Sequence, residues 1–189
     1  MQSKHLLLAA ATALLALPAL AQNNYVEIGA GRSDASVDCA GTISCDNTDT
    51  YLRAIVGYSF TPTWAVELSL AHLGRIKASA DMPGLGRVDA SARLRSVGLG
   101  VAASWPVSDA VSFTARLGIA SNRTSVSGSA AGQSTSDAEN NAAPYVGVAL
   151  GYAFSPTWTA SLTLDRTQAE FQGEKAAVVT AGLALRWKF

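Results

Sequence analysis

The sequence has little charge, few cysteines and, beyond its first residues, no long hydrophobic run. Charged residues make up 15% of the chain and balance to a formal net charge of zero. That balance argues against a nucleic-acid-binding protein, which normally has a strongly basic face. Beyond residue 21 no apolar run approaches the roughly 20 residues of a membrane-spanning helix, although 49% of the chain is hydrophobic. The apolar residues must therefore follow another pattern.

Cysteine is almost absent: the chain has only Cys39 and Cys45, in the stretch DCAGTISCD. In an exported protein such close cysteines favour a local disulfide, which closes a small loop and stabilises it modestly. A metal site is the alternative, but two thiols without a nearby histidine make a poor ligand set. We therefore predict a disulfide, no metal and no cofactor.

The first 21 residues have the layout of a secretory signal peptide. A short basic start with Lys4 is followed by an apolar stretch from Leu6 to Leu17, and small residues precede a cleavage site after Ala21. An uncleaved membrane helix is the alternative, but the apolar stretch is too short to span a bilayer. We expect residues 1–21 to be removed and residues 22–189 to form one domain.

Apolar residues in the remaining chain occur at every second position. Leu52, Val56 and Tyr58, for example, alternate with Arg53 and Gly57, so that one face of the strand is oily and the other is small or polar. Eight segments share this pattern, and we predict eight strands: 26–31, 51–60, 64–71, 96–105, 111–119, 146–154, 158–165 and 179–189.

Alternating strands also form water-soluble sandwiches and lipocalin-like barrels, in which the oily face points inward. Here the opposite face consists mostly of Gly, Ala, Ser and Thr, whereas soluble surfaces are richer in charge. Aromatic residues also gather at the strand ends, as expected for a membrane interface. This predicted aromatic girdle comprises Tyr58, Phe60, Trp64, Trp105, Phe113, Tyr152, Phe154, Trp158, Trp187 and Phe189.

The connections between the predicted strands alternate in length. Short turns occur at 61–63, 106–110 and 155–157, and longer polar segments lie at 34–49, 77–89 and 121–141, with a brief one at 172–175. We expect the Ser- and Gly-rich segment 121–141 to be a mobile loop. Two of the short turns repeat a motif, GYSFTPTW at 57–64 and GYAFSPTW at 151–158, which we interpret as two equivalent hairpins of one wall.

The signal peptide, these hairpins and the C-terminal GLALRWKF together resemble the small outer-membrane barrels of the OmpA/OmpX type, including the opacity-like surface proteins. The resemblance covers residues 22–189. It implies an all-β, eight-stranded antiparallel up-and-down transmembrane β-barrel in the outer membrane of a Gram-negative bacterium. It also implies that the barrel-assembly machinery recognises the terminal Phe189. We expect the chain to lack the periplasmic peptidoglycan-binding domain of full-length OmpA-type proteins.

Several charged residues fall on the face that would line the barrel: Glu27, Arg53, Glu67, Arg116, Asp165, Arg186 and Lys188. An eight-stranded barrel is only wide enough for side chains to fill it, and buried ions must be paired. We expect Glu27 and Arg186, on the first and last strands, to form a bridge. The charges then act either as a structural polar core or as a gate for small ions.

Basic residues gather around the second long connection: Arg75, Lys77, Arg87, Arg93 and Arg95. Guanidinium groups match phosphate geometry, so these residues are candidates for contact with lipopolysaccharide, although solvated rim charges explain them nearly as well. We expect outer-membrane lipids as partners, a host or matrix ligand at the loops, no nucleic acid and a monomer.

Some eight-stranded barrels are lipid A-modifying enzymes, which need an activated nucleophile beside a base. His72 is the only histidine beyond the signal peptide, and Ser69 and Glu67 fall on the opposite face of its strand. We therefore expect no catalytic residue. We predict a structural and surface-interaction role, in envelope integrity, adhesion or host contact. A small porin-like channel is the alternative, and a lipid A-modifying enzyme is a minor alternative.

Overall fold

The structure, a computed structural model, describes residues 23–36, 43–82, 86–130, 133–171 and 173–189. Side chains at 80–82, 86–89, 129–130, 133–135 and 171 are outside this description. The strands are β1 (Asn24–Ala35), β2 (Ser44–Asp46), β3 (Thr48–Ser59), β4 (Trp64–Met82), β5 (Gly86–Pro106), β6 (Val111–Ala130), β7 (Gln133–Ala153), β8 (Trp158–Phe171) and β9 (Glu174–Lys188). In the described part of the chain, no helix is long and apolar enough to cross a membrane.

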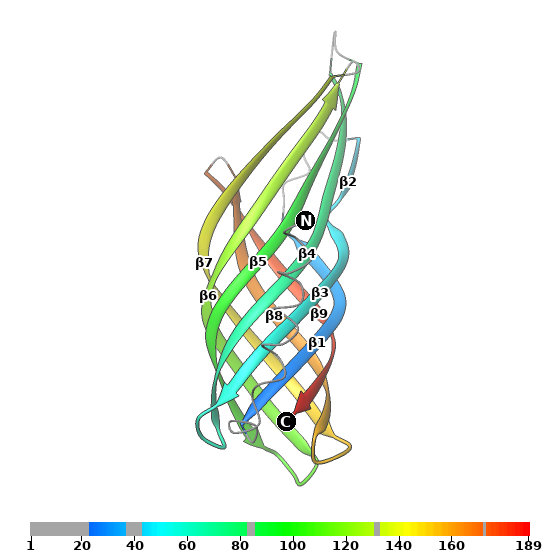
Figure 1. The fold of residues 1–189 in the computed structure, drawn as a ribbon. Coiled ribbons are helices and arrows are strands. Elements are labelled where there is room, and N and C mark those ends of the chain that lie inside the picture. The colour runs from blue at the N-terminus through cyan, green and yellow to red at the C-terminus, as the bar shows by residue number, and fades with distance from the viewer. Residues whose placement is uncertain (1–22, 37–42, 83–85, 131–132, 172) are drawn as a thin grey trace, which may run out of the picture.

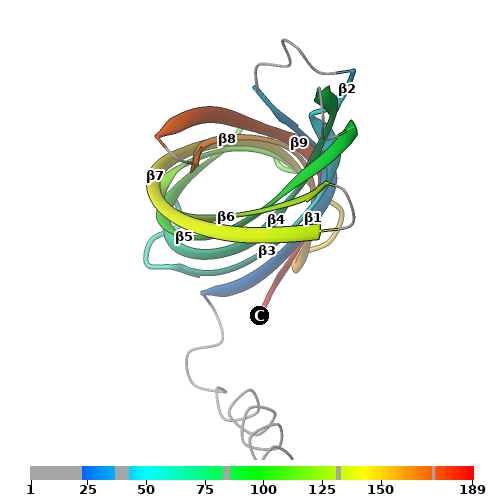
Figure 2. The ribbon, with the colours of Figure 1, turned by 90° about the horizontal axis from the view of Figure 1, so that it is seen from above.

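The long strands close into an antiparallel barrel (Figures 1 and 2). Each pairs with the next long strand along the chain, and β1 pairs with β9 to close the ring, with Glu27 opposite Arg186. The three-residue β2 adds to the upper part of β4 and is not part of the ring. The predicted eight-stranded up-and-down barrel is therefore confirmed.

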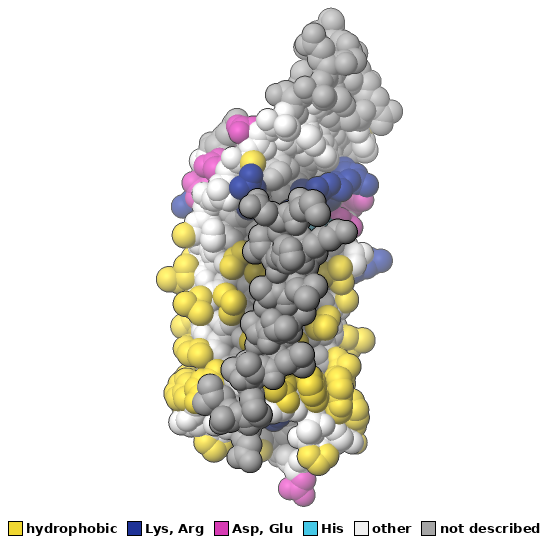
Figure 3. All heavy atoms as spheres, in the orientation of Figure 1, with side chains coloured by type: hydrophobic (Ala, Val, Ile, Leu, Met, Phe, Trp, Pro, Cys, Tyr) yellow, Lys and Arg dark blue, Asp and Glu magenta, His cyan; other side chains and the backbone are white. Residues whose placement is uncertain are grey.

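The apolar face of each strand points outward. Val56, Leu68, Leu99 and Leu183 are 57%, 48%, 67% and 65% exposed, whereas Glu27 on the opposite face is 1% exposed. Hydrophobic side chains accordingly cover the lower wall of the molecule in Figure 3. The lipocalin-like alternative, with a sealed hydrophobic centre along the whole axis, is wrong, because these aliphatic side chains lie on the outside.

The strands extend much further at one end than the sequence pattern predicts. Segments 77–89 and 121–141, expected to be loops, belong almost entirely to two hairpins, in which Met82 pairs with Gly86 and Ala130 with Gln133. The prediction of a loop at 121–141 is therefore wrong, and its mobility stays a prediction. The register fixed lower in the barrel lets the backbone ladder continue through Ser- and Gly-rich sequence, since ladder hydrogen bonds need no apolar side chains.

These extensions form a sheet above the barrel that we call the outer blade: residues 75–82 of β4, 86–95 of β5, 122–130 of β6 and 133–141 of β7. In Figure 1, β6 and β7 rise well above the β8–β9 hairpin. We call this the blade end of the barrel, and the opposite end, with the three short connections, the turn end.

A β-bulge marks the base of the outer blade. On β4 the register shifts between His72 and Arg75, so that Leu73 and Gly74 together lie opposite Leu94. Gly74 has φ +93°, a backbone conformation that favours glycine. The bulge reverses the alternation beyond it. Arg75 therefore pairs with the outward-facing Arg93, where simple alternation along β4 would have turned it inward.

Two polar side chains hold the bulge, Ser33 from β1 and Asp49 from β3. Ser33 donates a hydrogen bond from Oγ to the Leu73 carbonyl oxygen at 2.5 Å. The Asp49 carboxylate accepts one from the Thr50 N–H and one from the Arg75 N–H, each at 2.7 Å. Asp49 lies above the lipid-facing apolar rows, and these two N–H groups hold the pKa of its carboxyl below the ordinary value.

Candidate functional site: the barrel interior

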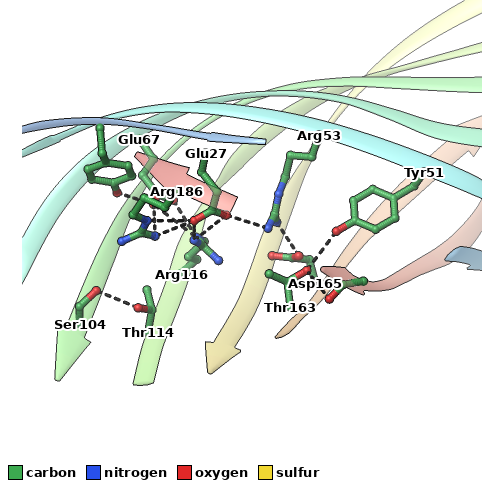
Figure 4. Close-up of polar contacts among 12 residues, drawn as sticks. Glu27, Tyr51, Arg53, Glu67, Ser104, Thr114, Arg116, Thr163, Asp165 and Arg186 are labelled. Carbon is green, nitrogen blue, oxygen red and sulfur yellow. Dashed lines mark hydrogen bonds and ion pairs between the residues drawn. The ribbon is translucent and has the colours of Figure 1, made fainter. Parts of the chain in front are cut away.

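Ionic side chains fill the barrel on the turn-end side of the bulge (Figure 4). Arg116 lies at their centre and donates to Glu27 Oε2 at 2.8 Å and to Glu67 Oε2 at 3.0 Å. Arg186 donates to the same Glu27 oxygen at 2.8 Å. Arg53 joins Glu27 at 3.1 Å and also contacts Asp165. Three carboxylates are thus matched with three guanidinium groups, and we call these six residues the ionic layer.

The ionic layer draws its members from six strands, because the barrel is narrow enough for side chains to meet across it. Glu27 and Glu67 are 1% exposed and Arg116 is 3% exposed, so the pairing offsets a large cost of removing charge from water. Glycines make the space. A Cβ at Gly147 would lie 2.0 Å from Asp165 Oδ1, so a larger residue there would displace the Asp165 carboxylate.

Aromatic rings complete this layer. The Tyr25 hydroxyl donates to Glu67 Oε1, and its ring stacks with the Arg186 guanidinium at 4.2 Å. A Cβ at Gly57 would meet the Tyr25 ring at 2.1 Å, so glycine is required there too. Tyr51 and Thr163 share a hydroxyl hydrogen bond of 3.0 Å beside Asp165. Tyr25 thus supplies a further donor to the buried Glu67 carboxylate, and the Tyr51 and Thr163 hydroxyls satisfy each other.

Lys188 is set apart from the ionic layer. It is exposed at the turn end, and the ion pairs among the described residues involve the other six predicted lumen charges but not this one. The structure therefore brings together six of the seven charged residues that the alternation assigned to the interior, including the predicted pair of Glu27 and Arg186.

The blade-end half of the interior holds an apolar cluster beside the buried polar side chains of Asn122, Thr124 and Thr167. Leu73, Leu94 and Val178 are 8%, 3% and 1% exposed and pack together with Ala35 and Ala169. We call these five residues the apolar layer. Its side chains come from five strands and meet at the level of the bulge. Extending the strand alternation past the predicted strand ends would have placed Leu73, Leu94 and Val178 inward, so the signal was present in the sequence.

A cavity of about 50 Å³ lies between the ionic and apolar layers. Ser69, Ser96 and Tyr145 line it together with Arg53 and Arg116. Within the described part of the chain, Arg53 Nε, Arg116 Nη1 and the Tyr145 hydroxyl are buried without a protein partner. The space and its polar lining suit ordered water molecules, which would satisfy such groups.

The predicted basic residues lie on the outside of the outer blade. His72, Arg95 and Arg123 stand side by side on β4, β5 and β6, with Arg75 and Arg93 paired in the next rows. Figure 3 shows Lys and Arg side chains gathered above the hydrophobic wall. We define the basic strip as Arg75, Lys77, Arg93, Arg95 and Arg123; the sequence analysis missed Arg123. Arg87 belongs to β5, but its side chain lies outside the described residues.

The predicted girdle residues lie at the turn end. Trp105 stacks on Phe113 and Trp158 on Trp187, each pair with ring centroids 6.1 Å apart. Phe189 contacts the Trp187 ring at 4.8 Å. The remaining predicted members are exposed on the same side: Tyr58, Phe60, Trp64, Tyr152 and Phe154.

The structure leaves other predictions untested. The signal peptide and Cys39 lie outside the described residues, so the cleavage site and the Cys39–Cys45 disulfide stay predictions. His72 faces outward opposite Leu52 and Arg95, while Glu67 is buried in the ionic layer on the other face of the strand.

Comparisons with known proteins agree with this fold. A sequence model of the outer membrane protein beta-barrel domain matches residues 7–189. No curated protein matches the chain. Solved structures do. Neisserial surface protein A is 15% identical with a TM-score of 0.62, covering 88% of this chain and 97% of its own. Ail, the attachment invasion locus protein of Yersinia pestis, is 18% identical with a TM-score of 0.55, covering 88% and 99%.

The outer membrane protein OprG from Pseudomonas aeruginosa is 13% identical, with a TM-score of 0.54 and coverage of 89% of this chain and 97% of its own. Ail is also known in complex with the heparin analogue sucrose octasulfate. At these identities the likeness shows the fold alone. The short connections of such barrels face the periplasm and the long ones face outward, which orients the turn end and the blade end.

Proposed function

Because this chain belongs to the outer membrane protein beta-barrel domain family and resides in the outer membrane, we propose that it is a sealed barrel whose role is structural and surface-interacting. It strengthens the envelope and contacts other surfaces through the outer blade. The observation that carries this proposal is the double closure of the interior. Two layers of unlike chemistry fill the barrel one above the other, so that its working surface is the outside.

The two layers support a sealed interior for different physical reasons. An ion crossing the ionic layer must break charge-assisted hydrogen bonds to Glu27, which accepts from Arg53, Arg116 and Arg186. Beyond that layer it meets Leu73, Leu94 and Val178, and hydrophobic constrictions exclude water and ions. A gate made of charges alone could open by exchanging partners, whereas the side chains of Leu73, Leu94 and Val178 offer an ion no partner.

The basic strip supports anchoring in the outer leaflet. Arg95 lies directly opposite Arg123 on the outer face, and like charges in such positions destabilise a sheet. None of the five strip residues takes part in the ion pairs of the described residues. The strip faces sideways, just above the hydrophobic wall. Phosphate groups of lipopolysaccharide lie at that height and would relieve the repulsion.

The heparin analogue bound by Ail is also a polyanion, and the basic strip is the surface of this chain with suitable charge. Its sideways orientation favours a membrane lipid over a soluble polymer. We further propose that the barrel-assembly machinery recognises Phe189 during assembly and that the assembled barrel is a monomer. No catalytic role is proposed, because the described groups around His72 lack a paired nucleophile.

Two measurements test the proposed function. In planar bilayers the purified barrel should show no steady conductance; open events that vanish in Arg116→Ser would overturn the proposal in favour of a channel.

The second measurement tests surface contact. Residues 125–138 are replaced by an Asn-Gly turn, which keeps Asn122 and Asn141, whose side chains bridge to β8. Loss of binding to cells or matrix with unchanged heat-modifiable mobility supports the proposal. If the unmodified barrel binds neither cells nor matrix, the proposed surface-interaction role is overturned.

The basic strip has its own test. Arg95→Ser/Arg123→Ser should lower the melting temperature in vesicles that contain lipopolysaccharide and leave it unchanged in plain phospholipid. Asp137→Ser/Glu139→Ser on the same blade is the matched control, because it removes two charges of the opposite sign. If the arginine variant and the acidic control variant have the same melting temperature in vesicles that contain lipopolysaccharide, the anchoring role is contradicted.

A further inference from the structure

A pocket of about 330 Å³ opens at the turn end of the barrel. The fold brings its walls together from the start of β1, the end of β9 and the turn between β3 and β4. The start of β1 and the end of β9 both lie at the bottom of Figure 1. Small-molecule sites have volumes of roughly 300–1,000 Å³, so this turn-end pocket can hold a small group such as the end of a peptide.

Backbone hydrogen bonds fix the walls of the turn-end pocket. The Ser59 N–H donates to the Asn23 carbonyl at 2.7 Å, and the Lys188 N–H donates to the Thr157 carbonyl at 2.8 Å. Tyr25 lies opposite Lys188 across the seam between β1 and β9. It is 2% exposed, and its hydroxyl contacts the ionic layer, so its ring stands between that layer and the pocket. The walls are therefore held in place by the barrel itself.

The lining of the pocket is rich in hydrogen-bond donors without a protein partner. Among the described residues, the side chains of Asn23, Ser59 and Lys188 make no hydrogen bond or ion pair. Thr61 Oγ1 accepts a hydrogen bond from the Trp64 N–H at 2.8 Å, which leaves its hydroxyl proton to donate. An ammonium group can only donate. A ligand that matches this lining must therefore supply acceptors.

Charge indicates which acceptor fits. Lys188 is the charged side chain of the lining, and within the described part of the chain no ion pair joins it to an acid, the terminal carboxylate of Phe189 included. One ammonium group surrounded by neutral donors matches a singly charged carboxylate. A phosphate monoester carries about −1.5 to −2 charges, part of which this pocket would leave unmatched.

The position of the pocket indicates where the carboxylate comes from. The turn end faces the periplasm. Ser59 and Lys188 continue the inward-facing rows of β3 and β9, so their side chains do not point sideways to lipid headgroups. Phe60, with 52% of its surface exposed, and Pro62 add apolar surface beside the donors. A carboxylate next to a small apolar side chain suits this combination.

We infer that the turn-end pocket binds the terminal carboxylate of a periplasmic peptide whose last residue is small and apolar. Lys188 Nζ pairs with the carboxylate, the Ser59 and Thr61 hydroxyls donate to its oxygens, and the last side chain of the peptide packs against Phe60. The inference goes beyond the proposed function, which concerns the outer leaflet and the outer blade. Such a carboxylate can belong to a soluble peptide or to a stem peptide of the cell wall.

The test uses the whole barrel in nanodiscs, with N-acetyl-Ala-Ala as the probe and its C-terminal amide as the control, which lacks the charge. Backbone amide shifts in NMR titrations should report binding of the acid and not of the amide. Lys188→Gln should weaken binding by about tenfold or more, the equivalent of a lost hydrogen bond to a charged group. Lys175→Gln, the same change at the blade end of β9, is the matched control and should bind as the unmodified barrel does.

Two further results locate the site. Ser59→Ala should weaken binding by about fivefold, as expected for one neutral hydrogen bond. In the unmodified barrel the shifts should centre on Ser59, Thr61 and Lys188, so the inference can be judged even if a variant fails to fold. Equal binding of the acid and the amide, shifts centred elsewhere, or undiminished binding by a folded Lys188→Gln barrel would overturn it.

Cosedimentation with purified peptidoglycan separates the two sources of the carboxylate. If the barrel sediments with peptidoglycan and N-acetyl-Ala-Ala releases it, the ligand is a stem peptide of the cell wall. If the barrel binds the probe but stays in solution, the ligand is a soluble peptide. Both results support the pocket. Neither bears on conductance or on binding to cells, so the proposed function and this inference can fail separately.

Discussion

The ionic and apolar layers fill the same narrow barrel with opposite chemistries. The ionic layer joins Glu27, Glu67 and Arg116 by directed contacts of 2.8 to 3.0 Å, and each ion is costly to leave without its partner. The apolar layer packs Leu73, Leu94 and Val178 without direction. The first layer therefore depends on every member being present, whereas the second depends on volume. Loss of one residue should consequently cost more in the ionic layer.

The largest expected effect is from Arg116→Met. It leaves Glu27 and Glu67 with fewer cations in a site where both are 1% exposed, and breaking a buried pair in this way costs about 3–5 kcal/mol. Urea unfolding in detergent micelles, followed by tryptophan fluorescence, measures the loss. Arg123→Met in the exposed basic strip is the control and should change stability by less than about 0.5 kcal/mol. Similar losses in the two variants would contradict the ionic layer's role.

A smaller loss is expected from Leu94→Ala in the apolar layer. Leu94 is 3% exposed, and truncating a buried leucine costs about 2–4 kcal/mol through lost burial and the cavity left behind. Leu99→Ala on the same strand is the control, because Leu99 faces outward and detergent can fill the space. The same urea titration compares the two, and an equal or larger loss at Leu99 would show that the blade-end interior is loosely packed.

The bulge at the level of the apolar layer predicts a third, smaller effect. Gly74→Ala places an alanine at φ +93°, with its Cβ 2.8 Å from Asp49 Cβ and 2.9 Å from Ser33 Oγ. Gly173 has φ +84°, and a Cβ there would meet nothing within 4 Å, so Gly173→Ala isolates the backbone cost of about 1–2 kcal/mol. Gly74→Ala should exceed it in the same titration. Equal losses would mean that crowding at the bulge is unimportant.

The smallest effect concerns pH. Because the pKa of Asp49 is lowered in the folded barrel, its carboxylate stabilises the bulge above the ordinary pKa of about 3.9, and this stability is lost as the pH falls through the folded value. Urea midpoints at pH 7 and pH 3 should differ less for Asp49→Asn than for the unmodified barrel. An identical pH dependence of the two proteins would exclude this contribution. Comparing the two proteins cancels every pH-dependent contribution that they share.

Alternation along the strands was enough to predict the barrel and the lumen positions of the ionic residues, because strand side chains have a strict period of two. Beyond residue 71, where the predicted strand ends, the same alternation would assign the wrong faces from Arg75 onward. The bulge at Gly74 reverses the faces of Arg75 and the residues after it, and no local pattern in this stretch marks the bulge. Segment 121–141 was misjudged for another reason: its strands depend on backbone pairing with neighbours distant in the sequence, which composition does not reveal.

The seam between the first and last strands has a consequence for the order of assembly. Glu27 on β1 receives hydrogen bonds from Arg186 on β9, so the central carboxylate lacks one of its cations until the end of the chain has been inserted. Most of the membrane-facing wall and the pairs Arg116–Glu67 and Arg53–Asp165 can form earlier, but Arg186 reaches Glu27 only when the ring closes. A barrel that stalls before its last strand would hold unmatched charge at its centre, and the final insertion step is favoured accordingly.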